Sequence, residues 1–245
     1  MYITSSVVVA ALASCAIAQA QTPKGFKPTA DTKLEVFFNT TSVKTAGELL
    51  SKATTATEPK LAVADSAVKA GDTYMFVMLD LDVPPQEGST NRRVLLHAMN
   101  TGFKATQQKL SGAGTLLAST QKGPAMYLPP GPPATDTMAH RYVQLLFKEP
   151  AALSVKASDF ANSTGRFNFD INTFMTEHKL GAPVAGNFFM VDGRANATAG
   201  NGRGTATGTG GAPRRTMAQF EGAAGIREVP YSLIGALSGL AMFAL

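Results

Sequence analysis

The stretch YMFVMLDLDVP, residues 74–84, carries most of the information about the fold. Residues 74–79 form an unbroken apolar run, which is typical of a strand that is buried on both faces. Asp80 and Asp82 follow at once, and the alternation of an extended chain places their side chains on the same side. Pro84 then ends the run. We therefore expect a buried central strand with two carboxylates at its end.

Apolar segments elsewhere predict a domain that is built mainly from strands. Further strands are expected at residues 34–38, 94–99, 142–147 and 187–191. Prolines and glycines punctuate the chain between them, most densely in the run LPPGPP at residues 128–133. Many strands with few helices favour an antiparallel β-sandwich with a few short peripheral helices.

One helix is expected between Asp170, which can cap its start, and Gly181, which can end it. Its apolar face is formed by residues spaced at i, i+3, i+4 and i+7, namely Ile171, Phe174, Met175 and His178. Because His178 completes this apolar face, we interpret it as a packing residue without a functional role.

The two ends of the chain resemble processing signals. An apolar run over residues 7–17 precedes Ala18-Gln19-Ala20, and this pattern predicts a secretory signal peptide over residues 1–20. Residues 223–245 end in an apolar segment, which predicts a removed GPI-anchor signal with Gly222 as the attachment site. An uncleaved leading helix and a tail-anchored helix are the alternatives.

Between these ends, composition separates a domain from a linker. Residues 21–192 are long enough for one domain with its own core. Residues 193–222 are rich in Gly, Ala and Thr and predict a flexible linker. We therefore expect a cell-surface protein that is GPI-anchored to the plasma membrane. Its N-x-S/T sequons, each a candidate for glycosylation, begin at Asn39, Asn162 and Asn196.

Composition also argues against some classes of site. The only cysteine, Cys15, lies in the predicted signal peptide, so the mature protein has no disulfide and no cysteine-ligated metal site. The formal net charge is +5, and no block of Lys or Arg alternates with aromatic residues. Nucleic-acid binding is therefore not supported.

Acids, histidines and prolines recur where strands begin or end. His97 lies within the segment RVLLH, and Gly131-Pro132-Pro133 is followed after six residues by His140-Arg141-Tyr142. Alternation puts His140 and Tyr142 on one face and Arg141 on the other. Two imidazoles and a phenol supply donors for a phosphate. A nearby carboxylate orients an imidazole or meets an ammonium group.

This ordered set, Asp-x-Asp-x-Pro after a strand, a lone His, then Gly-Pro-Pro and His-Arg-Tyr, resembles the signature of the phosphatidylethanolamine-binding proteins. That family includes the Raf kinase inhibitor proteins and the flowering-locus regulators. The segment LGAPVAGN at residues 180–187 is also similar, so the resemblance runs from about Leu34 to Val191. It implies an antiparallel β-sandwich and a small anion pocket.

The resemblance also implies the residues of the pocket. The predicted ligand-binding residues are Asp80, Asp82, His97, Pro132, Pro133, His140 and Tyr142. Asp82 and Pro84 match positions at the rim, where Val83–Pro84 is a candidate cis bond. Two departures favour a more open pocket: one extra residue precedes His140 compared with mammalian members, and the linker replaces the family's usual C-terminal helix.

The expected function is binding of an anionic or phospholipid headgroup, without catalytic residues, metal or cofactor, and with a peptidase or kinase as the possible partner protein. Family members that inhibit a serine carboxypeptidase make protease inhibition an alternative. A metal-dependent hydrolase that uses the Asp/His cluster is a second alternative. A surface protein with a vestigial pocket is a third.

Overall fold

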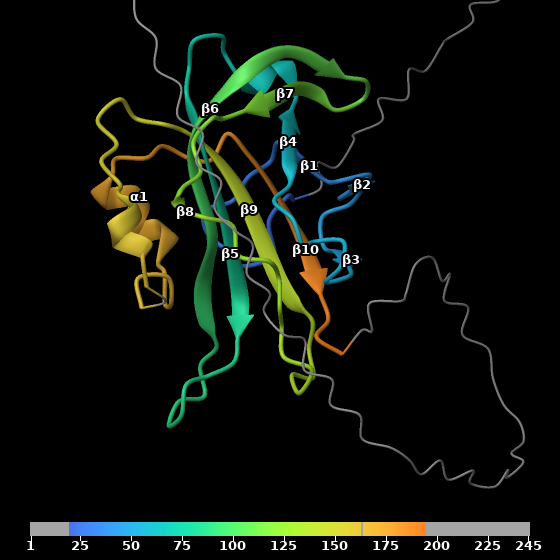
Figure 1. Ribbon diagram of the computed structural model, residues 1–245, viewed down its shortest axis with the longest axis vertical. Helices are drawn as coiled ribbons and strands as arrows, with labels where there is room; N and C mark the ends of the chain where they lie inside the picture. The colour runs from blue at the N-terminus through green and yellow to red at the C-terminus, as the bar shows by residue number, and fades with distance from the viewer. Residues whose placement is uncertain (1–19, 163, 195–245) are drawn as a thin grey trace, which may run out of the picture. The chain divides into compact units, whose positions relative to one another are not determined.

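The computed structural model describes residues 20–162 and 164–194. Residues 1–19 of the predicted signal peptide, Asn196, Gly222 and the predicted anchor signal lie outside the described residues. The described chain is mainly β (Figure 1). Its strands are β1 (Leu34–Phe38), β2 (Thr41–Ser42), β3 (Glu48–Leu50), β4 (Lys60–Val63), β5 (Tyr74–Val83), β6 (Arg93–Leu110), β7 (Gly114–Ala118), β8 (Pro124–Ala125), β9 (His140–Lys148) and β10 (Ala185–Val191). Its helices are α1 (Ile171–Glu177) and the 3₁₀ turns Asp65–Ala67 and Ala157–Phe160.

The strands form one continuous curled sheet rather than a sandwich of two separate sheets. Their order is β2-β1-β4-β7-β6-β5-β9-β10-β3, with β8 paired to β6. Neighbouring strands are antiparallel except β10 and β3, which run parallel. The sheet is continuous because the 18 residues of β6 pair with β5 along one part of the strand and with β7 along another. In Figure 1 the β6–β7 hairpin arches over the end of β4. The prediction of a mainly β fold is confirmed.

Both faces of β5 are buried, as its unbroken apolar sequence predicts. Tyr74, Phe76 and Met78 belong on one face to a cluster with residues of β1, β4 and β10. Met75 and Val77 belong to a second cluster on the opposite face, which α1 covers. Because both faces of this strand contact apolar layers, its sequence does not alternate between apolar and polar residues. This explains the apolar run over residues 74–79.

Helix α1 begins where the sequence predicts and ends earlier. The Asp170 carboxylate accepts hydrogen bonds from the backbone N–H groups of Asn172 and Thr173, which caps the first turn. The helix ends at Glu177 because Lys179 adopts a left-handed φ of 54°, two residues before Gly181. The ring of His178 lies 4.4 Å from that of Phe174, consistent with packing.

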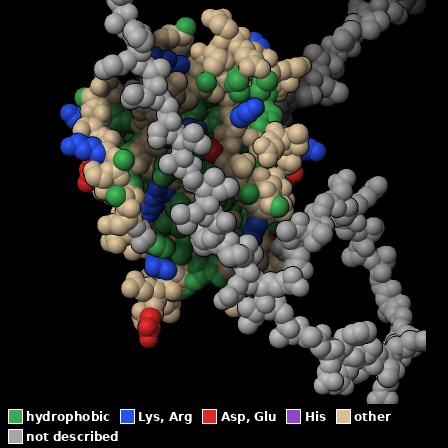
Figure 2. Space-filling model, viewed as in Figure 1, with side chains coloured by type: hydrophobic (Ala, Val, Ile, Leu, Met, Phe, Trp, Pro, Cys, Tyr) green, Lys and Arg blue, Asp and Glu red, His purple; other side chains and the backbone are tan. Residues whose placement is uncertain are grey.

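Two further observations concern the described residues as a whole. The cis peptide bond recorded among them joins Lys27 and Pro28, so the expectation of a cis Val83–Pro84 bond is wrong. None of their helices is long and apolar enough to cross a membrane. Figure 2 shows the Lys and Arg side chains of the face in view dispersed among other types rather than gathered in one block.

Candidate functional site

A cavity of about 370 Å³ lies where β5 ends and where β6 and β9 begin. The antiparallel register places Asp80 opposite Leu95 on one side and Tyr142 on the other. Three strands therefore bring their polar ends to one place. The predicted site residues that line the cavity are Asp80, His97, Pro132, Pro133, His140 and Tyr142.

His140 lies between two carboxylates. Its Nδ1 is 2.8 Å from Asp80 Oδ2, and its Nε2 is 2.9 Å from Asp136 Oδ2. Because ionised carboxylates only accept hydrogen bonds, this arrangement favours a ring in which both nitrogens donate, the imidazolium. Burial opposes that charge, but the bonds to Asp80 and Asp136 raise the pKa of His140 above its usual value.

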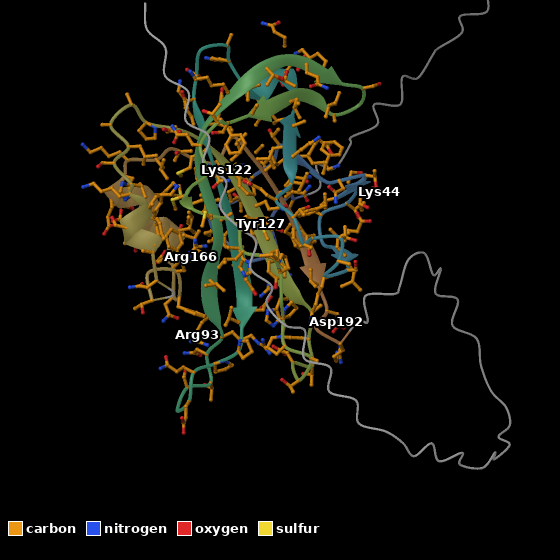
Figure 3. The ribbon with its side chains drawn as sticks, viewed as in Figure 1. Lys44, Arg93, Lys122, Tyr127, Arg166 and Asp192 are labelled. Carbon is orange, nitrogen blue, oxygen red and sulfur yellow. The ribbon has the colours of Figure 1, made fainter. Side chains whose placement is uncertain are left out.

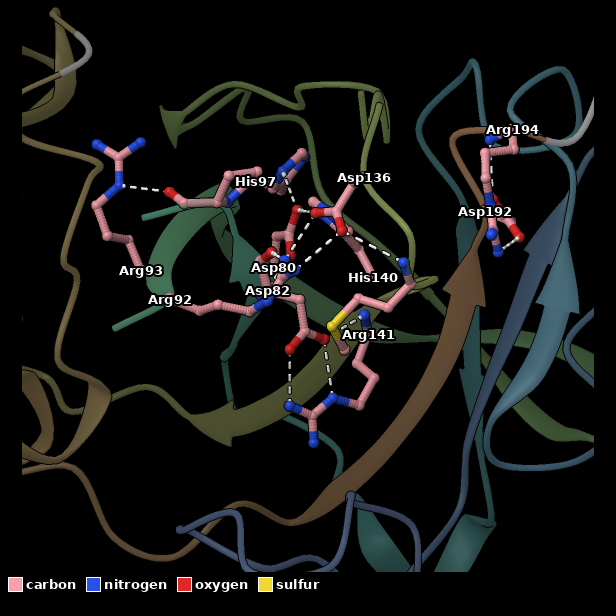
Figure 4. Close-up of polar contacts among 12 residues, drawn as sticks. Asp80, Asp82, Arg92, Arg93, His97, Asp136, His140, Arg141, Asp192 and Arg194 are labelled. Atoms are coloured by element: carbon pink, nitrogen blue, oxygen red, sulfur yellow. Dashed lines mark hydrogen bonds and ion pairs between the residues drawn. The ribbon is translucent and has the colours of Figure 1, made fainter. Parts of the chain in front are cut away.

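Asp136 is a residue that the sequence reasoning missed. Arg92 binds it through both terminal nitrogens, at 2.7 and 2.9 Å, and also donates to the carbonyl oxygen of Asp82. The Arg92 guanidinium, followed by His140, holds the pKa of Asp136 far below its ordinary value. The chain Arg92–Asp136–His140–Asp80 thus ties the loop before β9 to the start of β6 (Figure 4).

His97 is in the opposite electrostatic state to His140. Its Nδ1 donates to the carbonyl oxygen of Leu128 at 2.8 Å. Burial lowers the pKa of His97, and the bond to Leu128 and the charge of Asp80 only partly offset that effect. The ring is therefore neutral near pH 7, with a lone pair on Nε2. That nitrogen lies 3.9 Å from Asp80 Oδ2.

The hydroxyl group of Tyr142 is the unsatisfied group of the site. The residue is fully buried, and its hydroxyl makes no hydrogen bond of normal geometry to the described residues, although the Asp80 carboxylate and the Gly131 backbone lie near enough to affect its pKa. Its ring stacks on Phe189 and meets the edge of His97 at 5.1 Å, which fixes its position. Burial, followed by the charge of Asp80, raises the pKa of Tyr142, so the hydroxyl keeps its proton. It is a donor held at the wall of the cavity.

Comparison with known proteins decides the family. A family model described as phosphatidylethanolamine-binding protein matches residues 39–189, which include every residue of the cavity. The chain belongs to this family.

Two relatives in sequence and one solved structure are similar to this chain. The chain is 33% identical over 199 residues to phomoidride biosynthesis cluster protein N of Talaromyces stipitatus, covering 76% of this chain and 96% of that protein. It is 30% identical over 146 residues to a 26 kDa secreted antigen of Toxocara canis, covering 58% and 50% of the two chains. The solved carboxypeptidase Y inhibitor, complexed with its cognate proteinase, matches with a TM-score of 0.52 at 21% identity, covering 67% of this chain and 84% of that one. This structural match shows the shared fold.

Asp82 is not among the residues that line the cavity. Leu79 and Leu81 both pack in the second apolar cluster, so Asp80 and Asp82 share the other side of β5, as alternation predicts. The Asp82 carboxylate instead binds Arg141 through a two-bond fork, with both distances at 2.8 Å. Burial opposes its charge, but Arg141 holds the pKa of Asp82 below its usual value.

Apolar residues and one arginine complete the surroundings. The cavity wall includes Leu95, Leu128 and Phe167, which sequence reasoning did not single out. Arg166 is buried and donates to the carbonyl oxygen of Met126 at 2.9 Å (Figure 3). Leu95 comes from β6, whereas Leu128, Arg166 and Phe167 come from segments between the strands, whose contacts have no periodic signal.

The remaining predicted sites are on the surface or outside the described part. Asn39, in the turn between β1 and β2, and Asn162 are both exposed, and Asn196 lies beyond residue 194. Within residues 20–162 and 164–194, no group of three or more His, Asp or Glu side chains is arranged to hold a metal ion.

Proposed function

We propose that the protein is a non-enzymatic binding protein whose cavity takes a phosphorylated or similar anionic headgroup. The observation that carries the proposal is the fully buried Tyr142 hydroxyl, which lines the cavity and has no partner among the described residues. An unpaired buried donor costs free energy that a ligand oxygen recovers. The apolar wall accommodates the uncharged part of such a ligand.

The roles of the two histidines differ in this proposal. His140 uses both ring nitrogens on carboxylates, so it holds Asp80 in place rather than donating to the ligand. His97 faces the ligand with Nε2, which accepts a hydrogen from an ammonium or hydroxyl group. It takes up a proton when the ligand offers only anionic oxygens. Asp82 acts indirectly, because it holds Arg141, which lies between His140 and Tyr142 in the sequence.

Titration calorimetry with three probes tests the proposal: phosphate, phosphoethanolamine and ethanolamine. We expect both phosphorylated probes to bind, and phosphoethanolamine to bind more tightly because its ammonium group meets Asp80 and His97. Ethanolamine alone is expected to bind weakly. Absence of heat with either phosphorylated probe at millimolar concentration, from folded protein, contradicts the proposal.

Inhibition of a serine carboxypeptidase is the second candidate. It is supported by the fold shared with the carboxypeptidase Y inhibitor, over 67% of this chain. The assay is residual peptidase activity at increasing concentrations of the protein. Dose-dependent loss of activity supports an inhibitor, and a Tyr142→Phe variant then tells whether the cavity contributes to inhibition.

A hydrolase that uses the Asp/His cluster is the enzymatic alternative. It is retained because one relative is named for a biosynthesis cluster. Our proposal favours binding because both His140 nitrogens carry hydrogen atoms and so have no lone pair for a metal ion. We further propose the secretory location, GPI anchor and glycosylation that the sequence predicts.

A further inference from the structure

A second hollow, larger than the headgroup cavity, lies elsewhere on the described part of the molecule. A groove of about 730 Å³ lies between β1, β4, β7 and the tip of the β6–β7 hairpin. Its apolar floor includes Phe37, Leu110 and Leu116, which are only partly buried. We call the whole lined hollow the hairpin groove.

Polar side chains surround this floor. Lys60 and Gln108 line the hairpin groove and are exposed, and no described hydrogen bond or ion pair engages either side chain. Glu35 also lines it and pairs with Lys33 at 2.9 Å. An aromatic ring and aliphatic side chains bordered by free donors and acceptors match the two kinds of surface on a sugar, its C–H faces and its hydroxyl edges.

Asn39 is itself part of the lining of the hairpin groove. It occupies the turn between β1 and β2 with a φ of 51°, a conformation that Asn tolerates better than most residues. Its side chain is exposed and makes no described hydrogen bond. Asn39 also begins the sequon Asn39-Thr40-Thr41.

We propose that the hairpin groove is the seat of an N-linked glycan on Asn39, whose first sugars cover Phe37 and Leu116. The proposal rests on the secretory route proposed above but not on the headgroup cavity. Attachment forms a bond between the Asn39 amide nitrogen and the anomeric carbon of a lipid-diphosphate-linked oligosaccharide. The anomeric C–O bond breaks, the lipid diphosphate leaves, and the amide nitrogen loses one proton.

The sequon at Asn162 provides a contrast. The Asn162 side-chain oxygen accepts a hydrogen bond from the backbone N–H of Gly165 at 3.1 Å, and the residue does not line the hairpin groove. A glycan on Asn162 has no such surface to cover. The two sequons therefore form a matched pair, because Asn39 lies in the hairpin groove and Asn162 does not.

The experiment compares the full chain, secreted from a eukaryotic host, with three variants. Thr41→Ala removes the sequon and keeps Asn39 in its turn, whereas Thr41→Ser keeps the sequon and is the control for the strand. Asn162→Gln is the control for loss of a glycan elsewhere. Site occupancy is measured by peptide mass spectrometry after amidase treatment, which converts glycosylated Asn to Asp. Hydrogen exchange of residues 108–118 and Tm are then measured.

We expect Asn39 to be glycosylated in the wild-type protein, and exchange in residues 108–118 to be slower than in the Thr41→Ala protein. We expect that variant to lose about 2–4 °C of Tm, the size of a modest surface contact in a domain of this length. Trimming to a single sugar is expected to keep part of the protection. Thr41→Ser and Asn162→Gln should resemble wild type in residues 108–118.

Three results overturn the proposal. The first is an unmodified Asn39 in protein that carries sugar at another sequon. The second is equal exchange in residues 108–118 with and without the Asn39 glycan. The third is a dimer that protects these residues regardless of the glycan, which assigns the hairpin groove to a second copy of the chain. Headgroup binding, measured on the same samples, reports separately on the function proposed for the cavity.

Discussion

Tyr142 and Tyr127 carry the same hydroxyl group in opposite situations. The Tyr142 hydroxyl has no described partner and lines the cavity. The Tyr127 hydroxyl donates to the carbonyl oxygen of Thr55 at 2.7 Å (Figure 3). Removing each hydroxyl therefore separates binding from stability.

We predict that Tyr142→Phe weakens binding of phosphoethanolamine by about 1.5–3 kcal/mol, the usual worth of a hydrogen bond to a charged group. Stability should be unchanged or slightly higher, because the lost hydroxyl had no partner. Tyr127→Phe should lose about 0.5–1.5 kcal/mol of stability and leave binding unchanged. Calorimetry and urea unfolding measure the two effects. A Tyr142→Phe protein that binds like wild type excludes this hydroxyl from the ligand site.

The state of His97 predicts how binding depends on pH. Burial lowers the pKa of His97 in the free protein, and a bound anion favours the protonated ring and raises it. Anion affinity should therefore be highest below the free-protein pKa, which lies under ~6.5, and should fall as pH rises through the pKa of the complex. Sulfate is the suitable probe because its charge is constant in this range. Affinity that does not change between about pH 5 and 8 contradicts a ligand contact at His97.

At the scale of elements, the loop before β9 is held by its ion pairs. We predict that Asp136→Asn lowers the pKa of His140, because one of the two carboxylates that favour its charged form is removed. The raised pKa stabilises the fold fully below the unfolded value of ~6.5, and this contribution is lost as pH rises through the folded value. The Asp136→Asn substitution should diminish this pH-dependent contribution of His140 to stability. NMR titration of the His140 ring measures the shift.

Asp192→Asn is the control for that experiment, because Asp192 pairs with Arg194 on the surface rather than with His140. An unchanged His140 titration in the Asp136→Asn protein means that Asp80 alone sets the charge of the ring.

Gly193 links the end of β10 to the proline loop of the cavity. A Cβ there would overlap the carbonyl oxygen of Pro133 and approach that of Pro132 to 2.6 Å. We predict that Gly193→Ala displaces this loop, costs about 1–3 kcal/mol of stability and weakens headgroup binding. Gly181→Ala is the control, because a Cβ there meets nothing within 4 Å. Unfolding and calorimetry test both variants, and equal behaviour of the two contradicts a role for this contact.

The sequence predicts elements well where periodicity is strong. The strand at residues 34–38 and the Asp170 cap are found as expected, because both depend on local chemistry. Residues 104–110 of β6 have few apolar side chains, so no sequence pattern predicts the full length of this strand. The single curled sheet, which depends on that length, could not be predicted either. Asp136 could not be identified because its partner Arg92 is 44 positions away in sequence. The pairing of Asp82 with Arg141 likewise joins residues 59 positions apart in sequence, so no local pattern indicates it.

For the whole molecule, two surfaces of the sheet have separate uses in our proposals. The cavity at the strand ends takes the headgroup, and the hairpin groove takes a glycan. Phe37 in this groove is only partly buried. Covering such an apolar side chain with a glycan also limits unwanted association between molecules. In the arrangement that we propose at a membrane surface, the cavity stays accessible while the glycan covers the hairpin groove.

The last prediction concerns attachment to that membrane. Residues 223–245 have the small-residue site and terminal apolar segment of an anchor signal, so we expect them to be absent from the mature protein. A phosphatidylinositol-specific phospholipase should release the protein from intact cells, and mass spectrometry should find a C-terminal peptide that ends at Gly222 with a glycolipid remnant. A chain truncated before residue 223 is the control and should be secreted into the medium. Recovery of the 231–245 peptide from membrane-bound mature protein contradicts the anchor and indicates a tail that is itself inserted, since a lipid anchor replaces this segment during processing.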